Sequence, residues 1–167
     1  MKIDTTEAIK SAVDDAVQKI TWEVKSRAFR ASNELRNAAL TVLRGQRSGR
    51  VYKKPGTYGK RMTKQTKALL NDYGHNLRGG QLYRASAPGE PPAVRSGNLR
   101  QSWRPRTESE KTGSGLTVRS AITTDVKYAP WLNDGTKDGR IAPRPFEEPI
   151  IERAKPRIRR IFKEPYR

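Results

Sequence analysis

The first quarter of the chain carries apolar side chains every three or four residues, and neither glycine nor proline interrupts them. This spacing places the apolar side chains on one face of an α-helix. It predicts a helix over residues 5–44, about 60 Å long at the standard rise. The pair Asp4 and Glu7 resembles a capping box at its start, and Gly45 is a natural stop. The apolar positions are Ile9, Val13, Val17, Ile20, Val24, Ala28, Ala31, Leu35, Ala38 and Val42.

A helix of this length exceeds the diameter of a small domain, which favours contact with a partner. Trp22, Phe29 and Leu40 lie off the main apolar stripe. They predict either a second buried face or a face that a partner covers, and we assign Trp22 and Phe29 to an interface. Packing of the helix on the chain's own sheet explains the main stripe equally well.

Residues 46–98 are rich in glycine, proline and arginine and poor in apolar residues, which predicts an extended arm with little structure of its own. A short helix is expected within MTKQTKALLNDY, residues 62–73. Four tyrosines are interleaved with the basic residues. This mixture suits phosphate contact with some stacking, and it equally suits a hairpin arm whose tyrosines pack locally. The tyrosines are Tyr52, Tyr58, Tyr73 and Tyr83.

Residues 99–143 alternate apolar and polar side chains over short stretches, which is typical of β-strands. A first strand is expected at QSWRPRTE (residues 101–108), a turn at GSG (113–115) and a second strand at LTVRSAITT (116–124). The stretch DVKYAPWLNDGT (125–136) should begin extended and bend at Pro130 into a short turn that ends at Gly135. This part of the chain predicts a small antiparallel sheet.

Residues 144–163 predict a C-terminal helix whose apolar face begins at Phe146, and Pro156 should kink or split it. The whole chain, residues 1–167, then reads as a single α+β domain. Its parts are a long N-terminal helix, an extended basic arm, a small antiparallel sheet and a C-terminal helix.

Charge is distributed unevenly along the chain. The net charge is +18, and residues 44–106 hold 15 basic but only 2 acidic side chains. Such an excess favours polyanionic partners, either nucleic acid or an acidic protein surface. The basic arm comprises Arg47, Arg50, Lys53, Lys54, Lys60, Arg61, Lys64 and Lys67, with no acidic residue among them in the sequence.

Residues suited to catalysis are sparse. There is no cysteine, which excludes disulfides and thiolate metal sites, and the single histidine, His75, stands in a predicted loop. No stretch is long and apolar enough for a membrane span, and the N-terminus lacks the apolar segment of a signal peptide. We predict no catalytic, metal or cofactor site. A magnesium-dependent nuclease is a distant alternative that would need Asp125, Asp134 or Asp138 to converge.

Three motifs follow one another in the second half of the chain: ASAPGEPPAVRSGNLRQSW at 85–103, VKYAPWLNDGT at 126–136 and APRPFEEPI at 142–150. Together they resemble the head–tail joining family of long-tailed bacteriophages and prophages, also described as tail-completion or neck proteins. Members carry a PGxPPxxxSGxLRxS segment, then YAxxLxxGT, then RPF before a C-terminal helix. The resemblance covers about residues 84–162, and residues 51–83 are longer than the family usually has.

The resemblance implies a structural subunit with no catalytic site and no cofactor. Such a subunit would form a homo-oligomeric ring at the neck of the virion, after assembly in the host cytoplasm. The implied partners are the other neck proteins, namely the connector or adaptor, the head-closure and the tail-terminator proteins. Packaged DNA is a further partner, contacted without sequence specificity.

Physical reasoning divides the motif residues into two groups. Gly97 allows a backbone conformation that other residues avoid, Leu99, Trp103 and Phe146 are expected in the core, and Gly135 ends the second apolar cluster.

The second group is an interface. Pro88, Pro91 and Pro92 stiffen an extended segment with no expected role inside one subunit, so we assign it to a neighbouring subunit, together with Tyr128 and Trp131. A free-standing nucleic-acid-binding module that uses the basic arm is the main alternative function.

Overall fold

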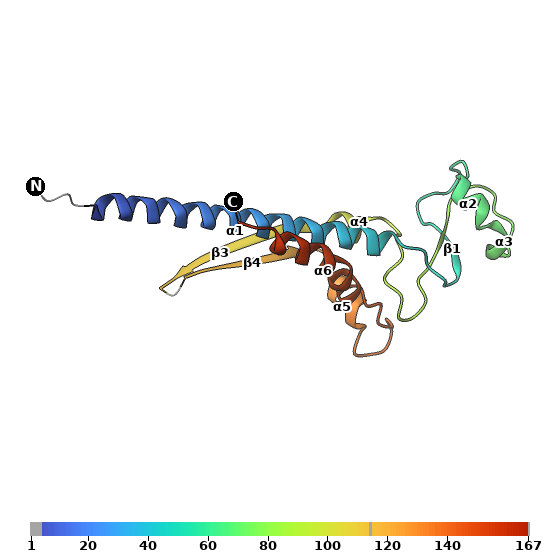
Figure 1. Cartoon of the computed structure of the whole chain (residues 1–167). Coiled ribbons are helices and arrows are strands. Elements are labelled where there is room, and N and C mark those ends of the chain that lie inside the picture. The colour runs from blue at the N-terminus through green and yellow to red at the C-terminus, as the bar shows by residue number, and fades with distance from the viewer. Residues whose placement is uncertain (1–4, 114, 167) are drawn as a thin grey trace, which may run out of the picture.

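The computed structural model describes residues 5–113 and 115–166 and shows a long helical rod with a body packed along its C-terminal half (Figure 1). Helix α1 (Thr6–Arg44) runs for 39 residues without a break, which confirms the predicted helix. Its N-cap is Thr5, and the proposed capping residue Asp4 lies outside the described residues. At the other end, Gly45 donates its backbone N–H to the carbonyl of Val42.

The last helix and the base of a β-hairpin pack against α1, and the outer end of the hairpin diverges from α1 towards its N-terminal half (Figure 1). Strand β3 (Arg104–Thr112) pairs antiparallel with β4 (Gly115–Thr123), with Thr107 opposite Ser120. Both predicted strands are confirmed, although β3 starts later than expected because α4 (Asn98–Gln101) occupies the residues before it. The predicted turn at 113–115 contains Ser114, which lies outside the described residues.

Helix α6 (Glu147–Lys163) confirms the predicted C-terminal helix. It continues through Pro156, so the expectation that this proline would split the helix is wrong. Pro156 is exposed, and water can therefore satisfy the carbonyl that the proline ring leaves unbonded.

Small buried residues let the hairpin approach α1 closely. Ala28, Ala31 and Ser32 are almost completely buried against it. The Ser120 hydroxyl donates to the Ala28 carbonyl at 2.8 Å, and the hydroxyls of Ser32 and Thr107 lie 3.3 Å apart. These bonds fix which face of the hairpin meets the helix.

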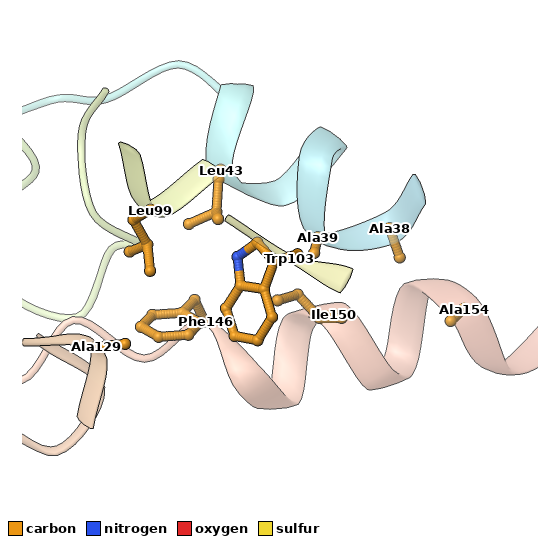
Figure 2. Packing of buried hydrophobic residues seen from close by; sticks show 9 residues of the cluster. All are labelled: Ala38, Ala39, Leu43, Leu99, Trp103, Ala129, Phe146, Ile150 and Ala154. Carbon is orange, nitrogen blue, oxygen red and sulfur yellow. The ribbon is translucent and has the colours of Figure 1, made fainter. Parts of the chain in front are cut away.

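The hydrophobic core lies between the last turns of α1, α4, the start of β3 and α6 (Figure 2). Leu99, Trp103 and Phe146 are all buried in it, as predicted. The rings of Trp103 and Phe146 meet edge to face, with centroids 6.0 Å apart. The full cluster is Ala38, Ala39, Leu43, Leu99, Trp103, Ala129, Phe146, Ile150 and Ala154.

Two parts of the chain are more ordered than the sequence suggested. Helix α5 (Ala129–Asp134) replaces the expected short turn, with Pro130 in its first turn, where a missing N–H costs no helical bond. The supposed arm contains β1 (Val51–Lys53), α2 (Lys64–Ala68), α3 (Leu70–Tyr73) and β2 (Leu82–Arg84). Strands β1 and β2 pair antiparallel, so the described residues form two small sheets where the sequence predicted one.

After α6 the chain returns to the middle of α1 (Figure 1). The buried Arg27 donates to the carbonyl of Pro165 at 2.8 Å and lies 3.9 Å from the ring centroid of Tyr166. Arg30 forms two hydrogen bonds of 2.6 Å with the carboxylate of Glu164. These contacts mark the N-terminal limit of the packed body, because every residue from Thr5 to Ile20 is exposed.

Candidate interaction surfaces

Residues 49–85 form a small closed lobe at the far end of α1, which we call the basic lobe (Figure 1). Two buried hydroxyl groups hold the lobe together through hydrogen bonds to its backbone. Thr66 accepts a hydrogen bond from the backbone N–H of Leu82, and Thr57 accepts one from Gln81 while it donates to the carbonyl of Lys54. The expectation that this stretch has little structure of its own is therefore wrong, whereas the expected short helix is confirmed as α2 and α3.

Two tyrosines of the basic lobe pack against each other, as one of the two interpretations of the sequence expects, and the phosphate-contact alternative stays a prediction. Tyr52 and Tyr83 face each other across β1 and β2 with ring centroids 6.2 Å apart. The ammonium of Lys53 lies 4.5 Å from the ring centroid of Tyr58. Tyr58 is 72% exposed, so one face of the lobe presents an aromatic ring beside a cation.

The cations of the basic arm fall into two classes. Arg47 is half-buried and structural, because its guanidinium donates to the carbonyls of Val42 and Pro92. Burial lowers its pKa, and the carboxylate of Glu90, distant in the sequence, partly opposes this shift. Lys53 and Lys54 are half-buried. The side chains of Arg50, Lys60, Arg61, Lys64 and Lys67 are exposed.

Both carboxylates of residues 44–106 are already engaged within the chain. Asp72 forms an ion pair with Arg84. Glu90 accepts hydrogen bonds from the Ser48 hydroxyl at 2.5 Å and from the backbone N–H groups of Ser48 and Ala87. These bonds, those from Ser48 first, lower the pKa of Glu90 to about 2. The exposed cations of the lobe therefore face solvent without a local carboxylate to balance them.

The proline-rich segment is bound to its own subunit. Pro92 is buried and Pro91 half-buried, and Pro88 alone of the three prolines is exposed. The guanidinium of Arg144 donates to the carbonyls of Ser86 and Ala87, and the backbone N–H of Gly89 donates to the carbonyl of Pro143. The expectation that this segment has no role inside one subunit is wrong.

Gly97 and Gly135 occupy conformations that other residues avoid. Gly97 has φ +89° and precedes α4, as the sequence predicted. Gly135 has φ +79° and ends α5, and a Cβ atom there would lie only 2.8 Å from the carbonyl oxygen of Ile141. Both glycines shape the loops around one groove.

A groove of about 840 Å³ lies between the basic lobe, the proline-rich segment, α4 and α5. It brings together residues from three predicted sets: Lys54 from the basic arm, Pro92 and Tyr128 from the interface set, and Leu99 from the core. The cations that line it are Lys54, Arg95, Arg100 and Arg144, and no carboxylate lines it. Sequence reasoning did not find this groove, because its walls come from separate segments.

The other predicted interface residues are exposed but lie apart from the groove lining. Trp22 is 70% exposed and Phe29 57% exposed on α1, and Trp131 is 57% exposed on α5. Large apolar side chains this accessible are typical of surfaces that meet another molecule. The predicted interface role of these side chains stays a prediction.

The acidic residues considered for a nuclease are dispersed. Asp125 pairs with Arg104, Asp138 with Arg140, and Asp134 accepts a hydrogen bond from Asn133. Among residues 5–113 and 115–166, no group of three His, Asp or Glu side chains could hold a metal ion. Within the same ranges, no helix has the length and apolar character that crossing a bilayer requires.

Comparison of this chain with protein-family models, with curated proteins and with solved structures finds no match.

Proposed function

We propose that this chain is a structural subunit of the neck of long-tailed phage particles, where copies form a ring between the head connector and the tail. One observation carries the proposal: the three motifs that resemble the head–tail joining family pack into one unit. Leu99 and Trp103 from the first motif, Ala129 from the second and Phe146 from the third lie in a single core.

The contacts between motifs extend beyond the core. Arg144 of the third motif binds the backbone of the first motif, and its own backbone N–H donates to the carbonyl of Leu132 in the second at 2.8 Å. The three motifs follow one another in a fixed order in the sequence. Because their residues build one local structure, we expect them to serve one function. Here that structure is the core and the groove beside it.

The exposed apolar residues further support a subunit that works in an assembly. A monomeric soluble protein seldom leaves large apolar patches in water, and Trp22, Phe29 and Trp131 are each more than half exposed. The proposal assigns no catalytic role, since a neck subunit acts by holding its neighbours.

The test is to delete the coding sequence from the phage or prophage genome that contains it and examine the particles by electron microscopy. We expect DNA-filled heads and free tails that do not join, and rescue by the intact chain supplied in trans. A fusion label on the chain should appear at the neck of rescued particles. Normal yields of joined particles without the chain would refute the proposal.

Non-specific DNA binding by the basic lobe is a second candidate function, favoured by its exposed, unbalanced cations beside Tyr58. Replacement of Lys60, Arg61, Lys64 and Lys67 by Gln would remove up to four phosphate contacts. The slope of log K against log salt for duplex DNA should then become shallower by about 3 to 4, at about 0.9 per contact. Replacement of Lys155 and Arg157 on α6 is the control. Equal slopes for all variants would exclude the lobe as the binding surface.

A further inference from the structure

The apolar stripe of α1 changes its surroundings halfway along the helix. Its positions are separated by three or four residues that sum to 11 in each repeat, a period that keeps Ile9, Ile20, Ala31 and Val42 on one face. Ala31 is buried and Val42 half-buried in the body. The first half of the same stripe is bare, with exposures of 61% for Ile9, 54% for Val13, 56% for Val17 and 51% for Ile20.

Residues 6–20 form the bare segment of α1, which on its own would be only marginally stable as a helix. It has about four turns, and an isolated helix of that length is marginal in water even with favourable residues. β-Branched residues such as valine and isoleucine lower helix propensity further. A regular row of them makes physical sense when another surface covers it.

The groove beside α4 and α5 is apolar and cationic. Apolar lining comes from Leu43, Val94, Leu99, Leu132 and Ile141, with the four cations named above at its walls. Over residues 9–20, Asp14 and Asp15 balance Lys10 and Lys19, so this segment is neutral and adds no positive charge to the cationic groove. In a chain with net charge +18, a neutral apolar helix segment is a better match for a cationic apolar groove than the basic parts of the chain are.

The groove cannot take the bare segment of its own chain. Leu43 in the groove wall and Ile9 in the bare segment belong to the same unbroken helix. Their separation along it is about 50 Å at the standard rise, and α1 points its N-terminus away from the groove (Figure 1). The occupant that the chain itself offers is therefore the α1 segment of a second copy.

We propose that residues 9–20 of α1 dock in the groove of the next copy, so that subunits join head to tail. The inference deepens the proposed function and rests on it, since a ring needs an interface of two different surfaces that repeats until it closes. It names those surfaces: the bare stripe of one subunit, and the groove lined by Leu99, Tyr128 and Arg100 of its neighbour.

Crosslinking tests this contact directly, because the natural chain has no cysteine. Val13→Cys on the bare stripe and Ala93→Cys on the groove wall are treated with a short bismaleimide. A mixture of the two single variants should give crosslinked dimers, and the double variant should give a ladder of higher oligomers. Gln18→Cys, on the opposite face of α1, is the matched control and should give at least tenfold less product with Ala93→Cys.

Disruption of the stripe provides the complementary result. The double variant Val13→Asp, Val17→Asp should remove self-association measured by sedimentation, while Gln18→Asp should keep it. All three residues are exposed, so far-UV circular dichroism should show an intact fold for both variants.

Any of three results would overturn the docking. The first is that Val13→Cys links to itself as efficiently as to Ala93→Cys. The second is that the Gln18→Cys control links equally well, and the third is that the mixture gives no product. The purified protein is used throughout, so the outcome is independent of particles. If ladders form but joined particles appear without the chain, the docking stands and the neck function falls.

Discussion

Removal of residues 1–19 should leave the stability of the single subunit almost unchanged, even though it deletes more than a third of helix α1. The structure shows every residue from Thr5 to Ile20 exposed. The hydrogen bond from Arg27 to the carbonyl of Pro165 lies outside the deleted residues. Residues 5–19 therefore contribute little buried tertiary surface to the body.

The expected magnitude follows from helix propagation alone. Each added residue changes the free energy of a helix by close to zero when its propagation constant is near one, so the segment should contribute less than about 1 kcal/mol. A single core truncation gives the scale for comparison. Leu43→Ala, at the opposite end of the same helix, should cost about 2–5 kcal/mol because Leu43 is 2% exposed within the core.

Urea unfolding followed by far-UV circular dichroism measures both variants against the full chain. Protein concentration must be low enough that the midpoint no longer depends on it, since self-association would add apparent stability. The urea dependence of the free energy should also be unchanged, because the deleted surface is exposed in both states. A loss above about 2 kcal/mol on deletion would refute the reasoning and show that the segment folds back on its own body.

Three further changes probe the core, the groove and the proline-rich segment, and urea unfolding measures each. Phe146→Ala should lower the free energy of unfolding by about 3–5 kcal/mol, whereas Phe162→Ala, half-exposed on the same helix, should cost less than about 1 kcal/mol. Gly135→Ala should cost about 1–3 kcal/mol or more, from its φ of +79° and the clash with a carbonyl oxygen. Glu90→Gln should destabilise the chain near neutral pH, and the difference from the wild type should shrink as pH falls. The pKa of Glu90 is lowered to about 2, so its stabilisation is full above the ordinary carboxyl pKa of 4.5 and is lost towards pH 2. A constant difference between about pH 6 and about pH 3 would contradict this assignment.

The sequence predicted the elements that rest on periodic burial. Helix α1, strand β4 and α6 each place apolar residues at the repeat of their secondary structure, and packing then follows from the pattern. Leu99, Trp103 and Phe146 were assigned to the core as the large apolar side chains of the motifs, and all three are buried. The predicted interface residues on α1, Trp22 and Phe29, are exposed. The apolar stripe and these aromatic residues extend beyond the surface of α1 that the rest of the chain covers.

The structures of the basic lobe and the proline-rich segment were not predicted, because polar contacts rather than apolar packing hold them in place. Thr57 and Thr66 are buried hydroxyls that bind the backbone of distant residues, and no repeat in the sequence marks them. The sequence assigned Arg47 to the basic arm and Arg144 only to the RPF motif, yet both donate to backbone carbonyls of residues 86–92. The groove is an outcome of these contacts, so it becomes visible only once the fold is known.

The attraction in the docking groove and the repulsion between basic lobes should depend differently on salt concentration. Copies with net charge +18 repel one another over long distances, and exposed charges more than about 10 Å apart are largely screened at about 0.1 M salt. The groove contact is short-range and largely apolar, so added salt weakens it much less. Self-association of the full chain should therefore strengthen as salt rises from about 0.01 M to about 0.1 M, as measured by sedimentation. The variant with Lys60, Arg61, Lys64 and Lys67 changed to Gln should associate more strongly at low salt and respond less to salt. Association that weakens steadily over this range would mean that opposite charges, rather than the apolar stripe, hold the copies together.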